Sequence, residues 1–225
     1  MCGRFTLAEP AMLGQRFGVQ LGLDASPDPR YNVAPSEQIS VVIEEPEGRV
    51  LRWMRWGFQP GWLKDPKRPP PINARAETLV ERPLFRGAVA RGRCLIPASG
   101  FYEWQAIPGR RTKQPIYIRL KDGGLFGFAG LYTEYRDETD GEPRSSCAII
   151  TTAANELMAP IHQRMPVIMR REDEGAWLDR TLSDPKAALV YLRAYPAEAM
   201  EAFAVSALVS SVRNDQAGLV EPLES

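Results

Sequence analysis

The sequence predicts a β-rich α+β fold with a few short helices. Twenty Pro and 18 Gly are spread along the 225 residues, as expected for many turns between short strands. Short apolar runs alternate with these turn residues. A hydrophobic content of 44% is enough for one sizeable core, and chains of this length often remain undivided. We therefore expect a single domain over residues 1–225.

Six apolar runs are typical of strands: 39–43, 50–54, 116–120, 125–132, 147–152 and 166–169. Helices are expected in five places: 6–18, 78–90 with an interruption, 153–161, 171–180 and 185–194. Segment 63–73 contains consecutive prolines, which cannot donate to a sheet, so it is predicted to be an exposed loop.

The N-terminal residues and the cysteines indicate the cellular compartment and whether a metal site is expected. The first residues include Arg4, Glu9 and Arg16 rather than an apolar signal region, and no apolar run reaches membrane-spanning length. These features predict a cytoplasmic protein that does not enter a membrane. Three Cys without CxxC or His–Cys spacing predict neither a disulfide framework nor a zinc site. Cys94 and Cys147 lie in apolar runs and are expected to be buried packing residues.

The formal net charge is zero, but the charges are unevenly distributed. Between Arg49 and Arg93 there are eleven Lys or Arg and three Asp or Glu, and Trp53, Trp56 and Trp62 lie in the same stretch. Basic side chains that bind phosphates and aromatic faces that stack on bases are the two components of single-strand binding. The alternative is a solvated basic surface with the tryptophans in the core.

Cys2 is the first candidate for covalent chemistry. A small residue after the initiator Met usually permits removal of Met1, which would leave Cys2 with a free α-amine and a thiol on adjacent carbons. Reference pKa values of about 7.7–8.0 for an α-amine and about 8.5 for a thiol make both groups partly available near neutral pH. With an aldehyde, this pair can form an imine and then a five-membered thiazolidine. The alternative is an incidental Cys near a terminus.

Two further residues are candidates for proton transfer. Glu103 lies in the aromatic run SGFYEW, where burying an unpaired carboxylate costs free energy. His162 is the only histidine, and an imidazole exchanges protons near neutral pH. The alternatives are an ion-paired strand residue for Glu103 and a structural or capping role for His162.

Asn73 and Arg75 follow the proline-rich loop in the run NARAET. A carboxamide can hold a substrate hydroxyl, and a guanidinium can bind a phosphate through two hydrogen bonds. The alternatives are turn chemistry for Asn73 and a surface ion pair for Arg75.

Taken together, nine motifs resemble the SRAP family, the SOS response-associated peptidases or abasic-site processing proteins. They extend over nearly the whole chain and occur in one order: MCGRF (1–5), RYNVAPSEQ (30–38), WGFQPGW (56–62), NARAET (73–78), RCLIPASGFYEW (93–104), AGLY (129–132), TTAAN (151–155), IHQRMPVI (161–168) and VSALVSSVRND (205–215). Gln163, Ser210 and Val212 depart from the family pattern. Ser210 and Val212 both lie in the last of these motifs.

The resemblance implies a single β-rich α+β domain with a mixed or antiparallel barrel-like sheet and a few short flanking helices. It implies a monomer without cofactor or metal that binds abasic sites in single-stranded DNA at the nucleoid. Catalytic roles then fall on four residues: Cys2 as nucleophile, Asn73 positioning the ring-opened sugar, and Glu103 and His162 moving protons. DNA contacts fall on Arg4, Arg75 and Arg164, with Trp62 and Trp104 as aromatic positions of the cleft. Autopeptidase and abasic-site lyase activities are implied as side activities.

Two other functions fit part of this pattern. Glutamine amidotransferases and other N-terminal nucleophile hydrolases also begin with MCG, and use a processed Cys2 to attack an amide. They have no need of Glu103 and His162 beside a basic, Trp-rich segment. A non-catalytic reader of modified bases would use the same cleft for binding only, and its binding would survive the loss of Cys2.

Overall fold

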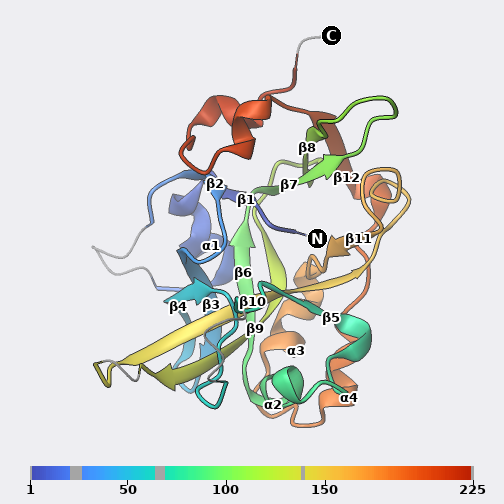
Figure 1. Cartoon of the computed structure of the whole chain (residues 1–225). Helices are drawn as coiled ribbons and strands as arrows, with labels where there is room; N and C mark the ends of the chain where they lie inside the picture. Colours follow the sequence, from blue (N-terminus) through green and yellow to red (C-terminus); the bar gives the residue numbers. More distant parts are fainter. Residues whose placement is uncertain (1, 21–26, 64–68, 138–139, 224–225) are drawn as a thin grey trace.

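A computed structural model describes four stretches of the chain: residues 2–20, 27–63, 69–137 and 140–223. The strands form two sheets (Figure 1). The first sheet has five antiparallel strands, and its order is β12 (Met200–Ala204), β8 (Gln114–Leu120), β7 (Gly100–Gln105), β1 (Phe5–Leu7) and β2 (Arg30–Val33).

The second sheet closes into a barrel. Its five closing strands are, in order around the ring, β10 (Pro143–Ala153), β4 (Gly48–Trp56), β3 (Gln38–Glu45), β6 (Arg93–Ala98) and β9 (Phe126–Arg136). The β10–β4 pair is parallel and the others are antiparallel, so the barrel is mixed. Two short strands extend β10 beyond the ring: β5 (Asn73–Arg75) runs parallel to it and β11 (Arg164–Pro166) antiparallel. The predicted β-rich α+β class with a barrel-like sheet is confirmed; that one domain spans residues 1–225 stays a prediction.

The helices are short, and two of them pack against barrel strands, α2 on β9 and α3 on β6. They are α1 (Leu13–Phe17), α2 (Pro83–Arg91), α3 (Glu174–Leu178) and α4 (Pro185–Ala188). Single 3-10 turns connect the remaining segments: η1 (Pro10–Met12), η2 (Ala76–Thr78), η3 (Arg171–Asp173), η4 (Leu189–Tyr191), η5 (Ala197–Ala199), η6 (Ala207–Ser210) and η7 (Ala217–Val220). No helix among the described residues is both long and apolar enough to pass through a lipid bilayer.

A buried aromatic cluster joins the first sheet to the barrel. The ring of Phe5 on β1 lies 5.2 Å from that of Trp56 and 6.0 Å from that of Phe128, and Phe101 lies 5.9 Å from Phe128. These edge-to-face contacts stabilise the fold beyond what the burial of the rings contributes. Because these contacts hold β1 against the barrel, residues 2–4, which precede β1, have a fixed position relative to both sheets.

Three local predictions were wrong. Segment 6–18 begins as β1, because pairing with β2 and β7 on both sides outweighs the helical pattern, and helix is found only from residue 10. Segment 153–161 forms turns, in which Asn155 Oδ1 accepts the N–H of Met158, and Pro160 prevents a continuing helix. Segment 166–169 is a strand only up to Pro166. Residues 64–68 of the predicted loop 63–73 lie outside the described residues.

Candidate functional site

Cys2 lies beside β7 and is fully buried. Its Sγ is 3.9 Å from the carbonyl oxygen of Arg4, and this carbonyl also accepts the backbone N–H of Tyr102 at 3.0 Å. The antiparallel register of β1 and β7 aligns Phe5 with Phe101, and the hydrogen bond from Tyr102 to Arg4 continues this pairing toward Glu103. The chain that leads into β1 therefore carries Cys2 alongside the end of β7 that holds Glu103.

Glu103 is the acidic neighbour of this thiol. Its side chain comes from β7 and is only 4% exposed. Burial raises the pKa of the Cys2 thiol strongly, and the negative charge of Glu103 raises it further. The thiol is therefore protonated at neutral pH, and any attack by its sulfur requires a nearby group that takes the proton.

Asn73 connects Cys2 to the barrel. Its Nδ2 donates a 2.8 Å hydrogen bond to the carbonyl oxygen of Cys2. Asn73 is the first residue of β5, which is paired with β10 at Ile149. Its Oδ1 is buried and accepts no hydrogen bond from the described part of the chain. Cys2, Asn73 and Glu103, from three different strands or their extensions, are thus brought together.

His162 precedes β11, on the other edge of β10. Its Nδ1 lies 3.0 Å from both the backbone N and the carbonyl oxygen of Arg164. When Nδ1 accepts from this N–H, the proton of the neutral ring is carried by Nε2. β5 and β11 both pair with β10 at Thr151, so Asn73 and His162 belong to the same end of the barrel.

The three arginines predicted to contact DNA differ in what they already bind. Arg75 on β5 is exposed, and its side chain makes no hydrogen bond or ion pair with the described residues. Arg4 NH1 donates to Asn32 Oδ1 at 2.9 Å and to the carbonyl oxygen of Val209 at 3.0 Å. The guanidinium of Arg164 binds both carboxylate oxygens of Glu77, at 3.2 and 2.9 Å. Of the three, only Arg75 has all its donors available for a phosphate.

The tryptophans also differ in exposure and in the contacts they already make. Trp62 is 61% exposed and lies on a hollow of about 400 Å³ that Arg91 and Arg180 also line. Trp104 donates from Nε1 to Ser210 Oγ at 3.1 Å and lies under the guanidinium of Arg4. For Trp56 the alternative of a core tryptophan is confirmed, because its ring is fully buried and its Nε1 donates to the carbonyl oxygen of Ile72.

The basic stretch is only partly a surface. Arg93 is 5% exposed and donates to the carbonyl oxygens of Val89 and Trp177, each at 2.6 Å, so it has a structural role. Arg52 is exposed and paired with Glu45. Three other basic residues of the stretch lie outside the described residues, namely Lys64, Lys67 and Arg68.

Comparison with known proteins decides the family. The family model "SOS response associated peptidase (SRAP)" matches residues 1–212. The chain belongs to this family. The Abasic site processing protein YoqW of Bacillus subtilis is 45% identical over 98% of this chain and 99% of its own length. YedK of Escherichia coli is 31% identical over 99% of this chain and all of its own length, and is also named an abasic site processing protein.

A vertebrate relative and a solved structure extend the comparison. The Abasic site processing protein HMCES of Gallus gallus is 31% identical and matches 87% of this chain and 67% of its own length. A crystal structure of a protein from Bacteroides thetaiotaomicron superposes with a TM-score of 0.86 at 27% identity, covering 99% of this chain and 100% of the other. The SRAP family is therefore supported by both sequence and fold.

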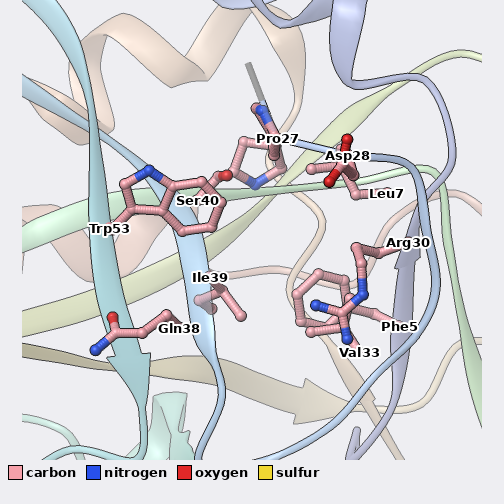
Figure 2. Close-up of a pocket in the computed structure, with 11 residues that line it drawn as sticks. Phe5, Leu7, Pro27, Asp28, Arg30, Val33, Gln38, Ile39, Ser40 and Trp53 are labelled. Atoms are coloured by element: carbon pink, nitrogen blue, oxygen red, sulfur yellow. The ribbon is translucent and has the colours of Figure 1, made fainter. Parts of the chain in front are cut away.

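A second hollow in this SRAP protein is not lined by Cys2. Phe5, Leu7, Ile39 and Trp53 line an apolar pocket of about 150 Å³ between the first sheet and the barrel (Figure 2). Because side chains alternate along a strand, Phe5 and Leu7 belong to the same face of β1, and both line this pocket. The pocket has no cysteine or histidine in its lining.

Sequence reasoning missed the residues that hold the predicted ones in place. Asn32, Glu77 and Thr151 were each part of a quoted motif but received no role. Thr151 accepts from Arg164 through its carbonyl oxygen at 2.6 Å, and Glu77 pairs with the same guanidinium. A signal was available for Asn32, because an amide within the strand-like run RYNV is costly to bury without hydrogen bonds.

Proposed function

We propose that this protein forms a covalent thiazolidine cross-link with abasic sites in single-stranded DNA, through the α-amine and thiol of Cys2 after removal of Met1. Membership of the SRAP family supports the proposal, as do the names of the relatives, which are abasic site processing proteins. The observation that carries it is the placing of the Cys2 thiol beside the buried Glu103, with its carbonyl held by Asn73.

The chemistry is balanced without a cofactor. The α-amine of Cys2 attacks the aldehyde carbon of the ring-opened deoxyribose, and loss of water gives an imine. The sulfur then adds to the imine carbon, the thiol proton passes to the imine nitrogen, and the five-membered ring closes. No electron donor or acceptor is consumed. Closure within one residue has the advantage of a high effective concentration of the thiol.

The neighbours of Cys2 supply the proton transfers. Glu103 takes the proton of the thiol, whose raised pKa makes unassisted ionisation rare at neutral pH. His162 exchanges protons with the hydroxyl that leaves as water when the imine forms. Asn73 fixes the main chain of Cys2, and its Oδ1, which accepts no hydrogen bond from the described residues, accepts one from the sugar hydroxyl. β-Elimination from the same imine would give lyase activity, and cleavage of the Met1–Cys2 bond is the peptidase step.

The DNA strand is proposed to run past the exposed arginine and tryptophan. Arg75 lies two residues from Asn73 on β5, and its guanidinium, which pairs with none of the described residues, is suited to a phosphate. Trp62, beside Arg91 and Arg180, offers an exposed ring on which a base can stack. We expect this activity from a monomer in the cytoplasm, at the nucleoid when the protein is bound to DNA.

The decisive experiment compares abasic and intact single strands on a denaturing gel. A heat-stable adduct is expected with the abasic strand only, because only that strand offers an aldehyde. Equal adduct with both strands would exclude the aldehyde mechanism. A matched protein with an uncleavable N-terminal extension should form no adduct, since an amide nitrogen cannot form the imine. Release of ammonia from glutamine would instead indicate an amidotransferase, and binding without adduct a reader of modified DNA.

A further inference from the structure

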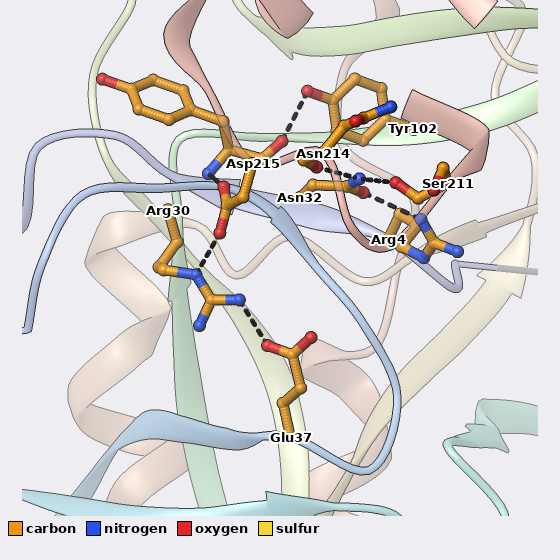
Figure 3. A network of polar contacts seen from close by, with 9 residues as sticks. Arg4, Arg30, Asn32, Glu37, Tyr102, Ser211, Asn214 and Asp215 are labelled. Carbon is orange, nitrogen blue, oxygen red and sulfur yellow. Dashed lines mark hydrogen bonds and ion pairs between the residues drawn. The ribbon is translucent and has the colours of Figure 1, made fainter. Parts of the chain in front are cut away.

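Asn32 lies on β2, and both polar atoms of its buried side-chain amide are hydrogen-bonded. Its side chain is 1% exposed. The two N–H groups of Nδ2 are shared among three carbonyl oxygens of the C-terminal segment, those of Val209 at 3.2 Å, Ser211 at 3.0 Å and Asn214 at 2.7 Å. Oδ1 accepts from Arg4 NH1 at 2.9 Å (Figure 3). The side chain of Asn32 thus links Arg4, in the segment that carries Cys2, to the segment 209–214, which lies more than 170 residues after Asn32.

The segment held by Asn32 also holds two predicted DNA contacts. The carbonyl oxygen of Val209 accepts a second hydrogen bond from Arg4 NH1 at 3.0 Å. The neighbouring Ser210 Oγ accepts from Trp104 Nε1 at 3.1 Å. Arg4 Cζ lies 5.9 Å from the centre of the Trp104 ring, within the range of a cation–π contact. Arg4 and Trp104 are therefore fixed relative to each other by residues 209 and 210.

The hydrogen bonds of Arg4 orient its guanidinium but involve only some of its N–H donors. A guanidinium has five N–H donors, and the two on NH1 are directed at Asn32 and Val209. The N–H groups of Nε and NH2 make no hydrogen bond within the described residues, so they remain able to bind a phosphate. An arginine that is fixed on one side in this way loses less side-chain entropy when it binds.

A second tether holds the same segment from the other end. Asp215 accepts from the backbone N–H of Tyr31 at 2.6 Å and pairs with Arg30 at 2.5 Å. Arg30 also pairs with Glu37 (Figure 3). None of these contacts includes Arg4 or Trp104. Loss of the Asp215 tether would free only the end of the segment and leave the hydrogen bonds at residues 209 and 210 in place, so Asp215 provides a matched control.

We propose that Asn32 is a positioning residue of the candidate site, which locks segment 206–215 against β1 and β2 and so orients Arg4 and Trp104 toward the DNA strand. This inference rests on the proposed function for the identity of the ligand. It assigns a role to the C-terminal motif VSALVSSVRND, which becomes one wall of the binding site. Ser210, one of the departures from the family pattern, is the hydroxyl that holds Trp104.

The first test measures the salt dependence of binding to an intact single strand, which requires no covalent step. Asn32→Leu should flatten the slope of log affinity against log salt by about 0.7, the value of one phosphate contact, as Arg4→Ala should. The double variant should show no further loss, because Asn32 acts through Arg4. Asp215→Asn should leave the slope unchanged. A full slope in Asn32→Leu, or losses that add in the double variant, would overturn the proposal.

The second test detects the lock without DNA. Amide hydrogen exchange over residues 206–215 should accelerate in Asn32→Leu, and also in Asn32→Asp, which keeps an acceptor for Arg4 but loses both donors. Asn32→Asp guards against a failure of Asn32→Leu to fold. Unchanged exchange in a folded Asn32→Asp protein would exclude the lock. If the wild-type protein formed no adduct with abasic DNA, the proposed function would fail, while both of these readouts would still decide the role of Asn32.

Discussion

The three cysteines of this protein are equally buried but lie in two different environments. Cys94 on β6 and Cys147 on β10 belong to the barrel, and Cys2 lies at the end of the first sheet. Burial raises the pKa of all three thiols. Cys94 packs so closely against Gly130 that a side chain there would come within 2.8 Å of its sulfur. Neither exposure nor thiol acidity distinguishes Cys2 from the other two.

The difference lies in the groups around each sulfur. Cys2 has the carboxylate of Glu103 within electrostatic reach and a carbonyl fixed by Asn73. The strongest neighbouring influence on the Cys94 thiol, after burial itself, is Cys147, which cannot accept its proton at neutral pH. A buried thiol in an apolar site is inert, whereas the same thiol beside a proton acceptor can react once substrate arrives. The comparison predicts opposite consequences for substitutions in the two regions.

The largest difference is expected from replacing the cysteines themselves. Cys2→Ala should abolish the heat-stable adduct with abasic DNA, while Cys147→Ala should retain it and lose about 0.5–3 kcal/mol of unfolding free energy. Adduct is measured on a denaturing gel and stability by urea unfolding. Cys2→Ser should keep an imine that borohydride traps, because its amine remains. An adduct of normal yield in Cys2→Ala would remove the distinction between the two regions.

A second difference concerns Glu103, for which two effects of opposite sign are expected. Glu103→Gln should slow adduct formation by about 10²–10⁴-fold, the usual contribution of a general acid or base. The same substitution removes a negative charge that raises the pKa of the Cys2 thiol, so alkylation of Cys2 by iodoacetamide at fixed pH should become faster. Mass spectrometry at Cys2 and gel kinetics measure the two rates. If only DNA affinity falls, Glu103 has a binding role instead.

The sequence predicted the central strands and selected the candidate site residues for physical reasons. The strands at 39–43 and 147–152 are apolar runs buried in the barrel, and their composition alone indicates them. Cys2 and Glu103 could be chosen because their chemistry is unusual for their positions. The helix at 153–161 was wrongly predicted because a proline near the end of a helical pattern was given too little weight.

Contacts between distant segments could not be predicted from the sequence. The role of Asn32 depends on three carbonyl oxygens from residues 209–214, and a backbone acceptor leaves no trace in the sequence. Similarly, nothing in the run NARAET shows that Glu77 forms an ion pair with Arg164. That ion pair depends on η2 and β11 lying close together beside β10. For Trp56 the sequence left two interpretations open, and the core position was settled only by the fold, in which the ring of Phe5 from the first sheet packs 5.2 Å from its own.

The barrel cysteines should also affect the pH dependence of stability. Burial keeps the thiol of Cys147 protonated in the folded protein, whereas in the unfolded chain a thiol ionises near about pH 8.5. The folded state then binds more protons than the unfolded state above about pH 8.5, so stability falls as the pH rises, by up to about 1.4 kcal/mol per pH unit for each thiol. Urea unfolding at about pH 7.5 and about pH 9.5, on either side of that value, should show a smaller loss for Cys147→Ala than for wild type. An identical loss would mean that other groups carry the alkaline dependence.

The smallest expected effect contrasts an arginine of the site with one of the barrel. Arg75 on β5 is exposed without a side-chain partner among the described residues, and Arg52 on β4 is exposed but paired with Glu45. Arg75→Ala should flatten the salt slope of single-strand binding by about 0.7, which is only about a 2.5-fold change in relative affinity between about 50 and 200 mM salt. Arg52→Ala removes the same charge from the barrel and should leave the slope unchanged. Titrations of a fluorescently labelled single strand at several salt concentrations measure both variants. Equal slopes for Arg75→Ala and wild type would remove Arg75 from the binding surface, and equal losses in both variants would show that only the total charge matters.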